Sequence, residues 1–290
     1  MVHPSKSVES VRVRRVRNGH AERVKDWVTI EEPLEIRLAL PGVPQGPGRP
    51  GTPPGVESIA VTMRTPGHDF ELAAGFLVTE GVVRRREDVR ELTYCRSGRG
   101  AQEYNIVEVR LRSARGVDLG RLSRNVFTSS SCGICGKASI DAVEVQGCRA
   151  LPDGTLRIPS QVLIDLPDRL RKAQGDFSRT GGLHGAGLFS AEGELLSIRE
   201  DVGRHNAVDK VVGEAFLAGG LPLHDTVLVV SGRTSFEILQ KAVVAGVPAV
   251  VAVGAPSSLA VDLATRFNLT LAGFVRGGGY NLYTGLERVT

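Results

Sequence analysis

Two cysteines in one short loop are the residues of this 290-residue chain best suited to covalent chemistry. The loop reads Cys132-Gly133-Ile134-Cys135 and is followed by Lys137 and an apolar segment, residues 138–145, that we predict to be helical. Unpaired backbone N–H groups and the positive end of a helix dipole stabilise a thiolate at such a position. The glycines leave room for the sulfur of a second molecule to approach. The pattern therefore favours a nucleophilic thiol that carries a group transiently.

Other interpretations of this loop stay open on spacing alone: a structural zinc site, a dithiol redox pair, or two inert buried cysteines. A closed zinc site usually has four ligands, often two such pairs, and here Cys95 and Cys148 stand apart. Zinc deaminases combine a C-x-x-C with H-x-E and a preceding proline. In this chain Ala186 stands where that glutamate is required, and Ser131 replaces the proline. The sequence argues against deaminase chemistry, and we predict no metal site.

Two loops and one glycine run could hold anionic groups. Residues 231–235 and 254–258 each stand between an apolar run and a predicted helix, where free N–H groups attract phosphate, although either is also an ordinary capped helix start. Residues 274–279 end a predicted strand in three glycines, which suits backbone contact with a ligand. Because parallel strands expose their carboxyl ends at one edge, we expect these loops to meet there. With a further glycine-rich stretch, they supply the candidate ligand-binding residues His184, Ser231, Arg233, Phe274, Val275, Arg276, Gly277, Gly278 and Gly279.

The elements that must position these residues fall into two patterns. Residues 27–125 contain several strand-like runs and a helix predicted at residues 68–78, and a stretch rich in proline and glycine, residues 41–55, interrupts them as a flexible insertion. Residues 126–290 alternate β-branched runs with helical segments, including a βαβαβ series from residue 226 onwards. We predict a β-rich N-terminal subdomain followed by an α/β domain with a largely parallel sheet.

Composition and charge restrict the partners. With 41% hydrophobic and 23% charged residues, the chain can bury a sizeable core. There is no apolar run of about eighteen residues, and the N-terminus is charged where a signal peptide would be apolar, so we expect a cytoplasmic protein without a membrane partner. Residues 1–25 hold seven Lys or Arg against two Glu. We interpret residues 1–26 as a disordered, solvated basic arm and predict no nucleic-acid partner.

Taken together, the motifs resemble those of the formate dehydrogenase accessory sulfurtransferase family, the FdhD type. The similarity runs in order from about residue 27 to residue 290 and leaves out the arm and the insertion. The stretches that carry it are RTPGHDFELAAGFL at residues 64–77, SCGICG at 131–136, TGGLHGA at 180–186, EDVGRHNAVDK at 200–210, SGR at 231–233 and GFVRG at 273–277.

This resemblance implies an α/β fold with a cytidine-deaminase-like three-layer core, assembled as a homodimer. It also implies a relay of persulfide sulfur from a cysteine desulfurase to a bound bis-molybdopterin guanine dinucleotide molybdenum cofactor, which formate dehydrogenase then receives. Cys132 matches the persulfide-bearing cysteine, Cys135 its partner in the motif, and residues 274–279 the cofactor-binding segment. The alternative is a chaperone for the molybdenum cofactor whose C-x-x-C is structural or redox-active.

Overall fold

The computed structural model describes residues 6–41, 55–95, 104–114, 117, 148, 150–154 and 156–290. Cys132 and Cys135, most of the predicted insertion at residues 41–55, and the predicted helix at residues 138–145 lie outside these ranges. None of the described helices has the length and apolar composition needed to cross a bilayer.

The N-terminal segment is a β-hairpin of β1 (Val8–Arg17) and β2 (His20–Thr29), so the prediction of a disordered arm over residues 1–26 was wrong for its described part. Asn18 and Gly19 connect the strands with φ of 50° and 80°. Two consecutive residues at positive φ make the hairpin turn for which Asn-Gly is the preferred sequence. The expected boundary at residue 26 therefore falls inside β2.

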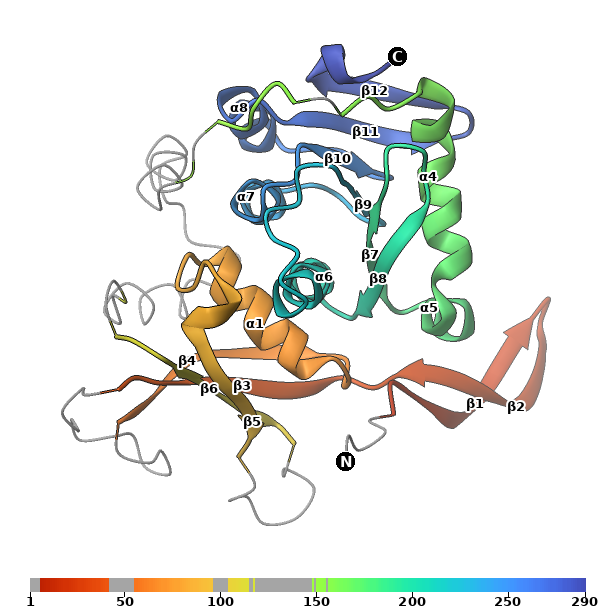
Figure 1. Cartoon of the computed structure of the whole chain (residues 1–290). Coiled ribbons are helices and arrows are strands. Elements are labelled where there is room, and N and C mark those ends of the chain that lie inside the picture. The colour runs from red at the N-terminus through yellow and green to blue at the C-terminus, as the bar shows by residue number, and fades with distance from the viewer. Residues whose placement is uncertain are drawn as a thin grey trace.

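A four-stranded sheet follows, in the order β4-β3-β6-β5. It consists of β3 (Glu32–Ala39), β4 (Val56–Arg64), β5 (Val89–Tyr94) and β6 (Ile106–Leu111), and the short 3-10 helix η1 (Arg86–Asp88) precedes β5. β3 pairs antiparallel with β4 and parallel with β6. Helix α1 (Asp69–Thr79) lies across this sheet (Figure 1). Together they form the β-rich N-terminal part.

The larger, six-stranded sheet has the order β12-β11-β10-β9-β7-β8. Its strands are β7 (His184–Phe189), β8 (Leu195–Asp201), β9 (Val227–Val230), β10 (Ala249–Ala252), β11 (Thr270–Arg276) and β12 (Gly279–Thr284). β10 pairs parallel with β9 and with β11. The expected βαβαβ series is confirmed, but the sheet is mixed rather than largely parallel: β7 pairs antiparallel with β9, and β7–β8 and β11–β12 are joined by short turns that permit only antiparallel pairing.

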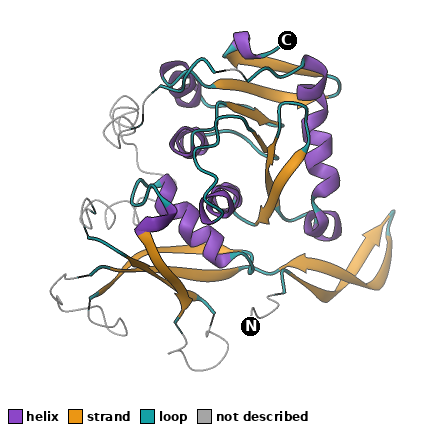
Figure 2. Ribbon diagram, viewed as in Figure 1, coloured by secondary structure: helices purple, strands orange, loops and turns teal. Residues whose placement is uncertain are grey.

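Helices cover both faces of the six-stranded sheet and make a three-layer arrangement (Figures 1 and 2). On one face lies α4 (Ser160–Ala173), with α5 (Gly175–Thr180) at its end; the other face carries α6 (Arg204–Leu217), α7 (Phe236–Ala245) and α8 (Ser258–Arg266). The 3-10 helix η2 (Leu286–Arg288) follows β12. Along β9, Val227 and Val229 pack with the leucines of α4, while Leu228 and Val230 face the opposite core. The continuous apolar run is therefore explained by burial on both faces.

Two of the motifs that carry the resemblance join the two sheets. Arg64 forms a buried bidentate ion pair with Asp69, with both N···O distances at 3.0 Å. Lys210 Nζ lies 2.8 Å from Asp201 Oδ2, and the same carboxylate oxygen accepts a bond from the backbone N–H of Thr65 at 3.1 Å. These side chains are almost fully buried. They hold the start of α1 against the end of β8 and the middle of α6.

Helices α1 and α6 cross at glycines. A Cβ at Gly75 would overlap the carbonyl oxygen of Asp209, and a Cβ at Gly213 would overlap that of Glu71. Only residues without a side chain allow the two backbones to approach this closely. The N-terminal part and the α/β part are thus joined by direct helix contact.

Candidate functional site

The three predicted loops meet at the carboxyl edge of β9, β10 and β11. The backbone N–H of Gly254 donates to the carbonyl of Gly232 at 3.1 Å, and the N–H of Phe274 donates to the carbonyl of Gly254 at 3.1 Å. The N–H of Thr234 donates to the carbonyl of Ala255 at 3.2 Å. The expectation that residues 231–235, 254–258 and 274–279 gather at one edge is therefore confirmed.

A cavity of about 550 Å³ opens between this edge and the α4–α5 segment. It is large enough for a ligand of about the size of one nucleotide. Six of the nine predicted ligand-binding residues line it, namely His184, Ser231, Val275, Arg276, Gly277 and Gly278.

The other three predicted residues do not line the cavity. Arg233 is exposed on its loop, and Phe274 and Gly279 flank the lining segment on either side. Phe274 takes a left-handed φ of 54° and leaves its ring 37% exposed. A Cβ at Gly277, Gly278 or Gly279 would meet nothing within 4 Å, so the open side of this turn is free of protein atoms.

The opposite wall comes from residues that the sequence did not single out. Helix α4 and the segment after it contribute two carboxylates, one guanidinium, one amide and one aromatic ring: Asp165, Asp168, Arg171, Gln174 and Phe177. The guanidinium of Arg171 lies 3.9 Å from the centre of the Phe177 ring. A pattern of leucines at positions 163, 166 and 170 could have indicated the helix. No sequence motif marks its polar side chains as part of a site.

Gln174 is the most informative of these residues. Its side chain is only 1% exposed and packs against Gly185, where a Cβ would lie 2.7 Å from the amide. The amide nitrogen Nε2 has no hydrogen-bond partner among the described residues. An unpaired buried donor costs about 1–3 kcal/mol. A ligand acceptor in the cavity would remove that cost.

The charges of the cavity suit a ligand that combines an aromatic base with phosphate. Arg171 and Arg276 provide two cations, and Asp165 and Asp168 can accept hydrogen bonds from ring and amino N–H groups. Burial and the nearby Arg204 lower the pKa of His184, which favours its neutral form. The backbone N–H groups of Gly277 and Gly278, which also line the cavity, add donors for an anion at the end of β11.

The FdhD/NarQ family matches residues 55–290, which include the strands, helices and loops that form this cavity. The chain belongs to the FdhD/NarQ family. Relatives named sulfur carrier protein FdhD include one from Streptomyces avermitilis, which is 52% identical over 97% of this chain and 95% of its own. One from Mycobacterium tuberculosis is 47% identical over 96% and 98% of the two chains. The fold matches a crystal structure from Desulfotalea psychrophila, described as that of a formate dehydrogenase accessory protein, with a TM-score of 0.72 at 23% identity over 98% of this chain and all of the other.

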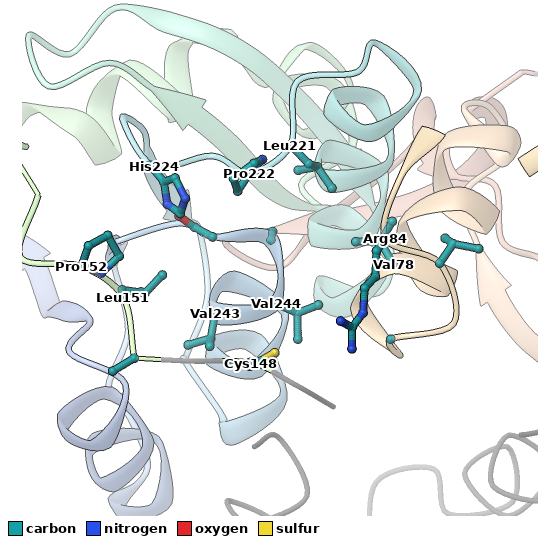
Figure 3. Close-up of a pocket in the computed structure, with 15 residues that line it drawn as sticks. Val78, Arg84, Cys148, Leu151, Pro152, Leu221, Pro222, His224, Val243 and Val244 are labelled. Carbon is teal, nitrogen blue, oxygen red and sulfur yellow. The ribbon is translucent and has the colours of Figure 1, made fainter. Parts of the chain in front are cut away.

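Cys148 of this FdhD/NarQ chain is not an activated thiol. Cys148 lies on the wall of a second cavity, of about 420 Å³, next to Val243 and Val244 (Figure 3). Burial raises the pKa of its thiol, so the reactive thiolate is disfavoured. The described residues contain no cluster of three or more His, Cys, Asp or Glu side chains arranged to hold a metal ion. The predicted nucleophile Cys132 and its partner Cys135 fall outside the described part of the chain.

A second histidine in this family member lies behind the same loops. His205 Nε2 is 3.4 Å from the hydroxyl of Ser235, the N-cap residue of α7. Burial and the neighbouring cations Arg204 and Lys241 lower the pKa of His205 to about 4. The ring is therefore neutral at physiological pH.

Acidification should destabilise the fold through His205. Its pKa of about 4 in the folded state lies below the value of about 6.5 for an unfolded chain, so the unfolded chain binds the proton first. Full stability is present above about pH 6.5 and falls as pH drops towards about 4. Because the side chain is 34% exposed, we expect a screened loss on the order of 1 kcal/mol.

Urea unfolding at pH values of about 7 and about 5 measures this effect. His205→Asn should flatten the fall in the free energy of unfolding between them. The same substitution at His20, the exposed first residue of β2, controls for loss of an imidazole. Identical pH dependence in His205→Asn and the wild type would contradict the assignment.

Proposed function

We propose that this chain is a sulfur carrier that delivers sulfur to a molybdenum cofactor destined for formate dehydrogenase. It accepts persulfide sulfur from a cysteine desulfurase on the Cys132–Cys135 loop and holds the bis-molybdopterin guanine dinucleotide cofactor as cargo. Relatives named sulfur carrier proteins support the carrier role. The single observation that supports the cargo site is the cavity lined by six predicted residues together with the unpaired amide of Gln174. We further propose a cytoplasmic homodimer with a deaminase-like core.

The loading step is a thiol exchange. The Cys132 thiolate attacks the outer sulfur of the donor persulfide, and a new S–S bond forms as the old one breaks. The desulfurase cysteine leaves as its thiolate, and Cys132 carries the outer sulfur as a persulfide. The exchange involves no net oxidation or reduction, so it needs no further reagent.

The cavity fits one guanine nucleotide end of the cargo. Aspartates and the Gln174 amide offer acceptors and a donor for a base, while Arg276 and the backbone N–H groups of the glycine turn would supply a cation and donors for a phosphate. Arg233, which the sequence suggested as a phosphate partner, and Arg276 are both exposed, but only Arg276 lines the cavity. Among the ligand-binding residues predicted from the sequence, Arg276 is therefore the cation expected to contribute most to nucleotide binding.

Arg276→Ala should weaken binding of GDP, used as a fragment of the cargo. Loss of a charge-assisted contact in a partly desolvated cavity costs about 1.5–3 kcal/mol, or roughly ten- to a hundred-fold in affinity. Calorimetric titration of wild type and variant measures the difference. Arg233→Ala, which removes a cation outside the lining, is the control and should change the affinity little. Absence of GDP binding, or equal effects of both substitutions, would place the nucleotide elsewhere.

A further inference from the structure

The β1–β2 hairpin projects from the body of the molecule (Figure 1). Its attachment is at its base: the hydroxyl of Thr29 donates to that of Thr180 at 3.0 Å, and the guanidinium of Arg179 lies 4.4 Å from the centre of a Trp27 ring system. A strand of ten residues is about 33 Å long, so most of the hairpin extends beyond this contact. An isolated two-stranded ribbon is only marginally stable in water. The pairing of side chains across the two strands therefore has a larger effect on the stability of the hairpin than it would have in a larger sheet.

The register of the hairpin places like charges opposite one another. Arg12 pairs with Lys25, and Arg14 pairs with Arg23. Neighbours on one face are directly opposite or two residues apart, so these four cations share a face, together with Trp27 beside them. We call the surface formed by Arg12, Arg14, Arg23, Lys25 and Trp27 the basic face.

Among the described residues, none of these four cations forms an ion pair that would offset their mutual repulsion. By contrast, Arg15 on the other face is paired with Asp26 at 3.7 Å and stands opposite Glu22. Like charges directly opposite each other destabilise a β-ribbon. Four cations opposed in this way on a marginal ribbon favour a role in binding an anionic surface.

The charge of the molecule is concentrated in this hairpin. Residues 8–29, the two strands and their turn, carry six Lys or Arg and three Asp or Glu, a net charge of +3, and the whole chain carries +4. The remaining residues together therefore carry only +1. A two-stranded ribbon can enter the major groove of DNA, so a duplex serves as the competing probe in the test below. Arginine and tryptophan together are typical of the energetic centres of protein interfaces, which favours a protein partner.

The basic face also begins next to the proposed cargo cavity. Helix α5 lies between the two. On one side, Arg179 and Thr180 contact the base of the hairpin. On the other side, Phe177 and Gly181, the C-cap residue of α5, line the cavity. A Cβ at Gly182, another lining residue, would lie 3.1 Å from the Thr29 hydroxyl. A protein bound along the hairpin would therefore stand at the cavity.

We propose that the basic face is the docking surface for an acidic patch on the enzyme that receives the cargo. This inference rests on the proposed function, because the recipient is identified there. Carboxylates on the recipient would relieve the repulsion between the opposed cations and would steer the encounter electrostatically. Docking at this place brings the recipient to the side of the molecule where the cargo would leave.

The test compares two double variants of the full-length protein that remove the same charge from the same strand. Arg12→Gln with Arg14→Gln alters the basic face, and Arg15→Gln with Arg17→Gln alters the opposite face. The probe is purified apo formate dehydrogenase from the same organism, with affinity measured by biolayer interferometry at low and at physiological ionic strength. The basic-face variant should bind about tenfold more weakly, with a reduced salt dependence, and the control should change about twofold or less.

Three results would overturn the docking surface. These are no binding of formate dehydrogenase by the wild type, equal weakening by both double variants, or a preference of the basic face for a DNA duplex over the enzyme. Thermal melts check folding, and the basic-face variant should remain folded because it removes repulsion. Persulfide loading of Cys132 is measured on the same samples. Its absence in the wild type would refute the proposed function separately from the docking result.

Discussion

Cys132→Ala is expected to abolish persulfide formation on the protein and, with it, maturation of formate dehydrogenase. Cys132 opens the C-x-x-C loop and precedes a predicted helix, so it has the strongest claim to a stabilised thiolate. A covalent carrier without its nucleophile has no remaining route for the sulfur, and the expected loss is complete rather than partial. Mass spectrometry after incubation with a desulfurase and cysteine measures loading, and formate dehydrogenase activity measures maturation.

Cys148→Ala is the matched control, because burial already disfavours the Cys148 thiolate. It should retain loading close to the wild-type level. Both variants should keep the circular dichroism spectrum and melting temperature of the wild type. Normal persulfide levels on Cys132→Ala would show that another group accepts the sulfur.

Gly213→Ala should destabilise the protein by about 3 kcal/mol or more. In a helix interior this substitution normally stabilises by about 0.5–1 kcal/mol, through lower backbone entropy in the unfolded chain. Here the added methyl group would overlap the carbonyl of Glu71 and approach the backbone nitrogen of Gly75. Because these neighbours are backbone atoms of a packed helix, relief requires α1 and α6 to move apart. Steric overlap should therefore outweigh the gain in propensity.

Gly175→Ala provides the comparison, since a Cβ there would meet nothing within 4 Å and its φ is not in the left-handed region. It should change the free energy of unfolding by less than about 1 kcal/mol. Chemical denaturation of both variants gives the two values. A Gly213→Ala protein as stable as Gly175→Ala would mean that the helices do not cross as closely as described.

Much of the fold could be predicted because the relevant signals are local. The parallel strands β9, β10 and β11 are short apolar runs, and β9 and β10 are each followed by a helix that begins after a serine, so periodicity and capping identify them. The hairpin was missed because its charge outweighed its turn signal, although Asn18-Gly19 between alternating valines is a strong one. The mixed character of the sheet depends on which strands become neighbours, and no local pattern determines that.

Some residues of the candidate site could be predicted from the sequence and others could not. Loops after parallel strands must share an edge, so the positions of Ser231, Val275 and Arg276 on the cavity follow from topology. The exclusion of Arg233 could not be predicted, because the direction of a side chain within a loop depends on its tertiary contacts. Gln174 could not be predicted either. Its role arises from a missing hydrogen-bond partner and from Gly185 on another strand, and neither has a signal in its own segment.

The most direct measurement of the sulfur-carrier account is a peptide map of the wild-type protein after incubation with a cysteine desulfurase and isotopically labelled cysteine. We expect one labelled sulfur atom on the peptide that contains Cys132, removable by reductant, and its transfer to the molybdenum cofactor when the cofactor is added. An unmodified thiol, a stable Cys132–Cys135 disulfide or zinc bound to the loop would each contradict a sulfur carrier. Labelled sulfur that stays on the protein in the presence of the cofactor would contradict the proposed delivery.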